Sequence, residues 1–290
     1  MTKTSSTRAS RARHTAQETG ADIGRYLLGM ELLRLRHTAR LRQADAVRAG
    51  VSPARLSQAE RGLTELPSAR ISALLNLYRA TRPERADLWA LHDAIPPAPA
   101  DGEDPAGEFQ DRAPGRWGRL AGMTGRAEAV TEFGTGYMPA RVQTAEYAAA
   151  LLRERAQRAG PDVVMALTGR CGPVRGEVVI TQPMLSSTVG GRWVMAGQLE
   201  HLARLAGGDG LVVVRVIPLG VVPAVQGALR LLTPVAGHPG VVARIHPAHI
   251  TYHAEALARI TVRHVVEQAA DAAWSAAMIR AAARRYGALP

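Results

Sequence analysis

Residues 43–62 read QADAVRAGVSPARLSQAERG, and this stretch predicts two short helices joined by a tight turn. The first helix ends at Gly50, because glycine adopts the left-handed conformation at low cost. Ser52 then takes the N-cap position and Pro53 the first helical position, which together mark a helix start. Helix, glycine turn and capped helix within 20 residues form the layout of a helix-turn-helix.

The second helix of this pair carries the side chains that would read DNA. Leu56 and Ala59 face inward and the helix stops at Gly62, so the remaining side chains face outward. In a helix-turn-helix the N-terminal turn of this helix enters the major groove, where side chains meet base edges. We expect base contacts from Pro53, Ala54, Arg55, Ser57 and Gln58, and phosphate contacts from Arg42, Gln43, Arg48, Ser52 and Arg61. The alternative is an ordinary helical bundle whose arginines are only solvated.

Helical periodicity continues on both sides of this motif. Residues 23–39 carry a leucine stripe at helical spacing, and residues 68–78 carry another apolar stripe. The sequence TRPE at residues 81–84 is a capping box with proline inside it, which opens a further helix. The sequence therefore predicts a module of five helices and no strand over residues 22–95.

Residues 96–111, PPAPADGEDPAGEFQD, predict a linker, because they contain four prolines, five acidic residues and no basic residue. Such a stretch cannot bury an apolar face. It divides the helical module from a larger C-terminal domain, residues 112–290. Residues 1–21 are expected to be a disordered tail, although their Ser-, Thr- and Arg-rich composition also resembles an organelle transit peptide.

The C-terminal domain has a mixed pattern that predicts an α+β fold ending in a long helix. Apolar, β-branched runs between Gly and Pro predict strands at residues 178–181, 211–217, 227–232 and 241–245. Helices are expected at residues 124–134, 143–158, 193–205 and 254–286. The order of the strands in the sheet is not predicted.

Charge and composition point to a nucleic-acid partner inside a cell. The net charge is +11, and residues 1–95 carry +7 of it, from 16 basic and 9 acidic residues. A basic N-terminal third favours a polyanion such as DNA. The lone cysteine, Cys171, excludes an intramolecular disulfide, and no apolar stretch reaches the roughly 20 residues of a membrane span. One lysine against 35 arginines indicates a GC-rich bacterial genome, so we expect a cytoplasmic protein without a membrane partner.

Two parts of the chain resemble known families. Residues 28–78 resemble the repressor-type (xenobiotic-response-element) helix-turn-helix family, through LLRLRHTARLRQADAVRAGVSPARLSQAERG and LPSARISALLNLY. The remainder resembles the C-terminal domain of an actinobacterial family of antitoxin-like transcriptional regulators, through EFGTGYMPARVQTAEYAAALL (132–152), PMLSSTVGGRWVMAGQLEHLARLA (183–206) and VVVRVIPLG (212–220). This resemblance implies binding to double-stranded DNA as a homodimer. It also implies that a small companion protein encoded nearby, or a ligand, acts on the second domain.

The helix-turn-helix departs from the family pattern at two places. Family members usually place eight residues from the helix-two Gln to the turn Gly, whereas Gln43 to Gly50 is seven, and the small Ala46 stands near a larger apolar position. Arg40 also replaces a glycine that is common before helix two. Either the helix shifts register so that Arg42 takes the Gln position, or the module is degrading.

Other candidate chemistry lies in the C-terminal domain. If the helix-turn-helix is vestigial, the domain would act as an enzyme or small-molecule binder of specialised metabolism, with a pocket built from Glu132, Tyr137, Arg141, Gln143, Trp193, Gln198 and His201. His246, His249 and His253 have a metal-like spacing, but Pro247 argues against the helix that would bring them together. No catalytic motif stands out, so we expect no metal, no cofactor and no enzyme activity. The favoured function is a sequence-specific DNA-binding transcriptional regulator whose C-terminal domain senses a companion protein or a ligand.

Overall fold

The computed structural model describes residues 20–97, 107–156, 174–207, 210–223, 225, 227–235, 240–246 and 248–287. The expected tail up to residue 19, the middle of the expected linker and Cys171 lie outside these described residues. We call residues 20–97 the helical module and residues 107–287 the sheet domain.

The helical module contains the five predicted helices. They are α2 (Gly20–Thr38), η1 (Gln43–Ala49), α3 (Pro53–Glu60), α4 (Ser68–Leu77) and α5 (Arg82–Asp93). The capping box that opens α5 is confirmed, because the Thr81 backbone N–H donates to the Glu84 carboxylate at 2.9 Å. Helix α2 begins at Gly20, so residues 20–21 belong to a helix and not to the tail.

The sheet domain is built on one sheet of seven strands, in the order β1-β7-β6-β5-β2-β3-β4. The strands are β1 (Glu108–Asp111), β2 (Ala127–Gly134), β3 (Arg175–Thr181), β4 (Val212–Ile217), β5 (Ala228–Val235), β6 (Val241–Ile245) and β7 (Ile250–Ala254). Strands β2, β3 and β4 run parallel to one another, whereas every pairing from β1 through β5 to β2 is antiparallel. The predicted α+β class is confirmed.

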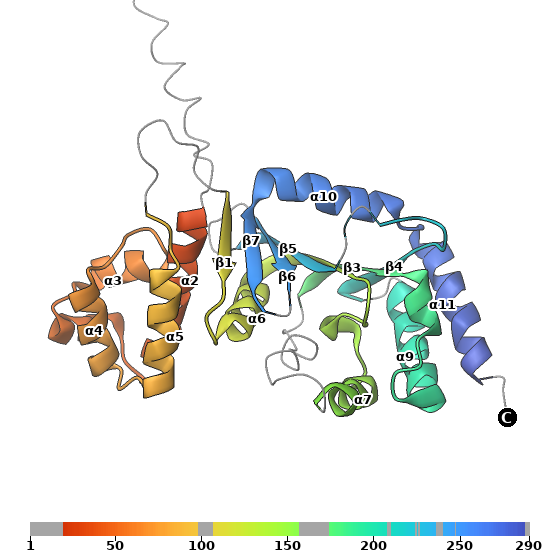
Figure 1. The fold of residues 1–290 in the computed structure, drawn as a ribbon, viewed down its shortest axis with the longest axis horizontal. Coiled ribbons are helices and arrows are strands. Elements are labelled where there is room, and N and C mark those ends of the chain that lie inside the picture. Colours follow the sequence, from red (N-terminus) through yellow and green to blue (C-terminus); the bar gives the residue numbers. More distant parts are fainter. Residues whose placement is uncertain are drawn as a thin grey trace, which may run out of the picture.

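Helices cover both faces of this sheet. They are α6 (Arg116–Arg126), η2 (Ala140–Val142), α7 (Ala145–Ala156), η3 (Gln182–Ser186), α9 (Gly191–Ala206), α10 (Glu255–Gln268) and α11 (Ala272–Gly287). Figure 1 shows α10 along one face of the sheet and α6, α7 and α9 on the other, with the helical module beyond β1 and α11 beyond β4. Alternate strand residues supply the two cores: Val178 and Ile180 pack toward α9, whereas Val179 packs toward α10.

The helix expected at residues 124–134 is wrong, because residues 127–134 form the strand β2 in the interior of the sheet. Its sequence AEAVTEFG is rich in helix-forming Ala and Glu, but hydrogen bonds from β3 and β5 on either side override this preference. Strands β1 and β7 were also not predicted. Residues 108–111, expected as the end of the linker, form β1.

The chain ends in a helix as predicted, but the expected 254–286 helix is divided into α10 and α11. The break lies at the edge strand β4, where the Ala270 N–H donates to the Val216 carbonyl at 2.9 Å. Asp271 then caps α11 by accepting from the Trp274 N–H at 2.7 Å. The turn between the helices therefore satisfies backbone groups that an edge strand would otherwise leave open.

The helical module and the sheet domain share one hydrophobic core. Side chains of α2 pack in the same cluster as Phe109 of β1, Tyr252 of β7 and Trp117 of α6. A buried ion pair crosses the same boundary: Arg119 of α6 contacts Asp87 of α5 at 2.6 Å and Asp111 of β1 at 2.8 Å. The two parts therefore form a continuous structure around β1.

Candidate nucleic-acid interface

The position of α3 is fixed by a close crossing with α2. A Cβ atom at Gly29 of α2 would lie only 2.3 Å from the backbone oxygen of Ala59, so the two helices meet backbone to backbone. Leu56 and Ala59 of α3 are buried, as predicted. Gly62 ends the helix with φ of 73°, where a Cβ atom would clash with the backbone of Tyr26. These contacts leave α3 one orientation, with its opposite face outward.

A buried ion pair holds the end of α3. The Arg36 guanidinium donates from Nε to Glu60 Oε1 at 2.5 Å and from Nη2 to Oε2 at 2.9 Å, and both side chains are buried. Hydrogen bonding to Glu60 raises the pKa of Arg36 above its usual value, although burial opposes this. The third guanidinium nitrogen, Nη1, donates to the Leu41 carbonyl at 2.9 Å. One cation therefore joins α2, the following turn and α3.

The N-terminal turn of α3 is capped and open to solvent. Ser52 Oγ accepts a hydrogen bond from the Arg55 N–H at 3.3 Å, and Pro53 occupies the first turn, as the sequence predicts. Four of the five residues expected to contact bases are exposed, namely Pro53, Ala54, Arg55 and Gln58; Ser57 is half-buried. A capped helix start with free N–H groups suits an anionic partner.

A basic rim surrounds this surface. Three of its arginines were expected to contact phosphates and are exposed: Arg42, Arg48 and Arg61. Sequence reasoning missed Arg70 of α4, whose Nη1 lies 3.4 Å from the Ala49 carbonyl and against Gly50 at the turn. Its position in the first turn of the predicted 68–78 helix is the sequence feature that could have pointed to it. We use "basic rim" for these four arginines.

Gln43 has a partner inside the module. Its Nε2 donates to Glu60 Oε2 at 2.8 Å, which adds it to the buried ion pair at the end of α3. This bond ties Gln43 to α3, and the second N–H of its amide remains for the phosphate contact that we expect. Since Gln43 is also the first residue of η1, the register shift that would bring Arg42 into its place does not occur.

The one-residue shortening of helix two is compensated by its winding. The seven residues of η1 form a 3-10 helix, and at about 2.0 Å per residue they span about 14 Å, whereas eight residues of an α-helix span about 12 Å. The small Ala46 is buried at 1% exposure, so it fits the interior of the module. Gly50 ends η1 with φ of 69°, as predicted. The short helix therefore spans at least the length of an α-helix that is one residue longer.

Arg40 occupies a position that suits glycine. Its φ is +56°, in the left-handed region that non-glycine residues rarely adopt. The Leu41 N–H donates to the Arg36 carbonyl at 3.1 Å across it, which closes the C-terminal end of α2. A glycine before helix two would satisfy this geometry without strain, which accounts for the residue usual in the family.

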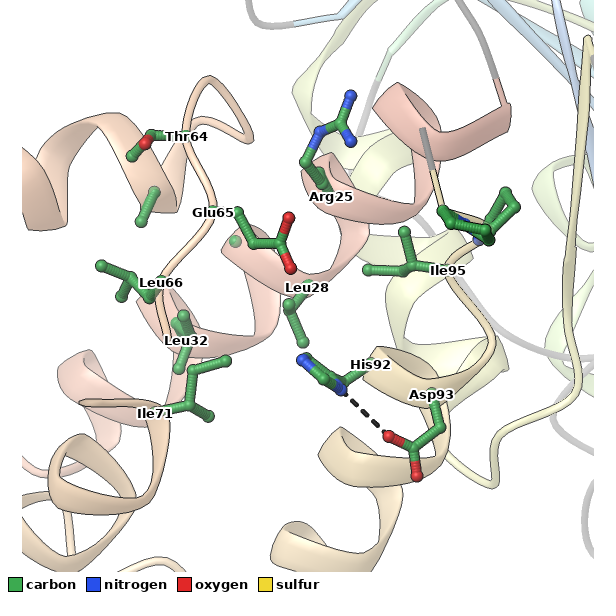
Figure 2. A pocket seen from close by; sticks show the side chains of 14 residues that line it. Arg25, Leu28, Leu32, Thr64, Glu65, Leu66, Ile71, His92, Asp93 and Ile95 are labelled. Atoms are coloured by element: carbon green, nitrogen blue, oxygen red, sulfur yellow. Dashed lines mark hydrogen bonds and ion pairs between the residues drawn. The ribbon is translucent and has the colours of Figure 1, made fainter. Parts of the chain in front are cut away.

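A cavity of about 320 Å³ lies within the helical module. Figure 2 shows its apolar floor, with Leu28 and Leu32 of α2 facing Leu66 and Ile71. Ionisable side chains also line it, among them Glu65, His92 and Asp93, and His92 Nδ1 lies 3.0 Å from Asp93 Oδ1 (Figure 2). The cavity is formed by the same helices that position α3.

None of the seven residues proposed for a pocket in the sheet domain lines the cavities at the strand ends or at the α9–α11 face. Several of them bond inside the fold. Glu132 pairs with Arg230 in the buried space below α6, and Arg141 donates to the carbonyls of Val130 and Val174.

Two of the seven, Gln143 and Gln198, lie together and bind backbone. Gln143 donates to the Met138 carbonyl at 2.7 Å, while Gln198 donates to the Val142 carbonyl at 2.6 Å and accepts from the Thr144 N–H at 2.8 Å. They hold the segment before α7. Tyr137 and His201 are half-buried, whereas Trp193 is 83% exposed on the outside of α9.

The three histidines lie at a hairpin and form no helix face. His246 and His249 stack with ring centroids 4.5 Å apart, and His253 of β7 lies 3.8 Å from the carboxylate of Glu108. Within the described ranges, no group of three His, Cys, Asp or Glu side chains is placed to hold a metal ion. In the same ranges, no helix has the length and apolar character needed to cross a bilayer.

Comparison with known families assigns both parts of the chain. A profile described as a helix-turn-helix domain matches residues 27–88, which places the chain in the class of helix-turn-helix DNA-binding regulators. A second profile, described as a domain of unknown function (DUF5753), matches residues 117–285, more than half of the chain. The protein therefore belongs to the DUF5753 family. No curated protein and no solved structure matches it.

Proposed function

We propose that this protein is a sequence-specific transcriptional regulator that binds operator DNA through α3 and responds to a signal through its sheet domain. The observation that carries the proposal is the capped, exposed start of α3 beside the basic rim. Arg55 and Gln58 project from this helix, and these residue types make bidentate contacts to guanine and adenine. The rim arginines supply cations for phosphates on either side.

The geometry of helix two supports an active rather than a vestigial module. A degrading motif would be expected to lose its buried ion pair or its cap, and here Arg36, Glu60 and Ser52 keep both. The proposal also includes a homodimer, because helix-turn-helix proteins commonly bind two half-sites. A companion protein or ligand acting on the sheet domain, the antitoxin-like family role and a cytoplasmic location are parts of the same proposal.

The direct test is fluorescence anisotropy with duplex DNA from upstream of the gene and with a scrambled duplex, at two salt concentrations. We expect tight, salt-sensitive binding that prefers the native duplex. The variants Arg55→Ala and Gln58→Ala should each weaken binding to the native duplex by about 1–3 kcal/mol and relax its sequence preference. Arg70→Ala should weaken binding to both duplexes equally and reduce the salt dependence.

A matched control removes an arginine far from α3. Arg204 lies on α9, and Arg204→Ala should leave binding to either duplex unchanged. Binding of the unaltered protein that ignores sequence, or equal losses from Arg55→Ala on both duplexes, would contradict base reading by α3.

A further inference from the structure

Three parallel strands end together at one edge of the sheet. Strands β2, β3 and β4 finish at Gly134, Thr181 and Ile217, and their parallel registers bring these ends side by side. The chain then returns from β4 to β5, whose first residues pair with the end of β2. The connection therefore crosses this carboxyl edge. In sheets with parallel strands, ligands bind outside the carboxyl ends.

A cavity of about 450 Å³ lies at this carboxyl edge. Its size falls in the range of roughly 300–1,000 Å³ that small-molecule sites occupy. The lining combines strand ends, such as Thr135 and Thr181, with apolar residues of the returning connection, such as Leu219, Val222 and Val225. Among the described residues that line it, none carries a charge. We call it the carboxyl-edge cavity.

Side-chain amides hold the connection open. Gln182 Oε1 accepts a hydrogen bond from the Leu219 N–H at 2.8 Å, and Gln268 of α10 donates to the Val222 carbonyl at 2.9 Å. With the backbone fixed in this way, Leu219 and Val222 are left 74% and 81% exposed. Adjacent exposed apolar side chains around a preformed hollow indicate a binding surface rather than ordinary surface scatter.

The chemistry of the lining selects the ligand. A charged molecule would lose water without gaining an opposite charge, which is costly, whereas apolar surface gains by leaving water. The Thr135 and Thr181 hydroxyls can donate and accept hydrogen bonds and so orient a bound molecule. The other described cavities differ, because each has charged groups in its lining. Of the two beside α9 and α11, one is lined by Arg204, Arg280 and Arg284 and the other by Arg192 and Arg285. The cavity in the helical module is lined by ionisable groups such as Glu65 and Asp93.

We infer that the carboxyl-edge cavity binds a neutral, largely apolar small molecule carrying at least one hydrogen-bonding oxygen or nitrogen. Its role as the effector site of the regulator rests on the proposed function, whereas the binding itself does not. The site lies in the sheet domain, at the C-terminal ends of β2 and β3, which begin at Ala127 and Arg175.

The test uses the full chain and the neutral dye Nile red, displaced by a series of 1-alkanols. We expect one saturable dye site per chain. Alkanol affinity should rise by about fourfold for each added methylene until the chain fills the cavity, and then stop rising. A dye signal without saturation, or alkanol affinity that rises without a limit, would overturn the proposal, because an open apolar surface has no fixed size.

Two matched variants each introduce one negative charge, one after the end of β4 and the other before its start. Leu219 follows β4 and Leu211 precedes it, and both are exposed, so neither substitution disturbs the core. Leu219→Asp should weaken dye binding at least tenfold and Leu211→Asp should not. Equal losses in the two variants would overturn the site. So would dye binding that follows self-association in sedimentation, since the surface would then be a contact between copies.

DNA binding is measured separately in the same samples. Leu219→Asp should bind the native duplex as tightly as the unaltered protein, because the cavity is remote from α3. If the unaltered protein does not bind the native duplex, the proposed function is contradicted, but the evidence from dye binding for the cavity is unaffected. Loss of saturable dye binding alone would contradict only the cavity.

Discussion

The helical module and the sheet domain use buried charges in similar ways but present opposite surfaces. In the module, the Arg36–Glu60 pair fixes α3 so that its outer face is polar and basic. In the sheet domain, the Glu132–Arg230 pair joins β2 and β5 below α6, and the surface at the strand ends is apolar and uncharged. The difference fits the two kinds of partner that we propose, a polyanion for the module and a neutral ligand for the domain.

Arg119 is the residue at which the two regions meet. Burial lowers the pKa of Arg119, but hydrogen bonds and charge attraction from Asp111 and Asp87 outweigh it and raise the pKa above its usual value. The Gly115 N–H also donates to Asp87 Oδ1, at 2.5 Å. This buried cluster of charges links the sheet domain to α5 of the helical module.

The largest expected effect comes from breaking this contact. Arg119→Met leaves two carboxylates buried without their cation, which should cost about 3–5 kcal/mol of unfolding free energy. Urea unfolding followed by circular dichroism measures it, and the unaltered protein should show one transition for both regions. Arg204→Met, at an exposed arginine, should change stability by less than about 0.5 kcal/mol. A similar small loss for Arg119→Met would show that the regions are joined by apolar packing alone.

Two helix caps of equal expected strength separate stability from DNA binding. Ser52→Ala removes the cap of α3 and Thr81→Ala the cap of α5, and each should cost about 1 kcal/mol of stability. Only Ser52→Ala should also weaken binding to the native duplex, because α3 belongs to the proposed DNA interface and α5 does not. Anisotropy and urea unfolding on the same samples give both quantities. Equal DNA losses from the two variants would contradict the assignment of α3.

A smaller effect concerns the backbone before helix two. Arg40 has a left-handed backbone conformation that costs an L-residue about 1–2 kcal/mol of stability. Glycine avoids this strain, but it costs about 0.5–1 kcal/mol of stability because it loses more conformational entropy when the chain folds. Arg40→Gly should therefore stabilise the protein by up to about 1 kcal/mol. Arg79, with φ of 55°, offers a matched position after α4, and Arg79→Gly should behave alike. A loss of stability in both variants would contradict the strain argument.

The smallest expected effect is a pH dependence of stability that arises from histidines of the sheet domain. Burial lowers the pKa values of three histidines in the sheet domain, His201, His249 and His253. Nearby positive charge lowers them further: Arg204 acts on His201, His246 on His249, and Arg244 and His246 on His253. The carboxylate of Glu108 raises the pKa values of His249 and His253, but less than the other causes lower them. The folded state therefore favours neutral imidazole, while the unfolded chain takes up protons near pH 6.5. Stability should fall as pH drops through that value. Thermal unfolding at about pH 7.5 and about pH 5.5 measures the change.

The control for this pH effect is a histidine variant. His253→Gln should show a smaller difference between the two melting temperatures than the unaltered protein. A melting temperature that rises on acidification, or an unchanged difference in His253→Gln, would contradict the role of burial at these histidines.

Nearly all of the helical module is predictable from the amino-acid sequence, because its signals are local. Gly50, Ser52, Pro53 and the TRPE capping box act within one or two helical turns, and the structure confirms each of them. Helical periodicity predicts the exposed positions of α3, because Leu56 and Ala59 mark its buried face. Four strands of the sheet were also predicted, because their β-branched runs need no distant partner to be noticed.

Contacts between residues far apart in the chain become visible only in the folded structure. Strand β2 looks like a helix until β3 and β5 provide its hydrogen bonds, and the bond from the Gln43 amide to Glu60, 17 residues away, arises only from the packing of α3. The carboxyl-edge cavity likewise depends on strand order, since its walls come from segments up to 92 residues apart, from Thr135 to Gly227. Contacts at such separations depend on packing and pairing, which local sequence does not specify.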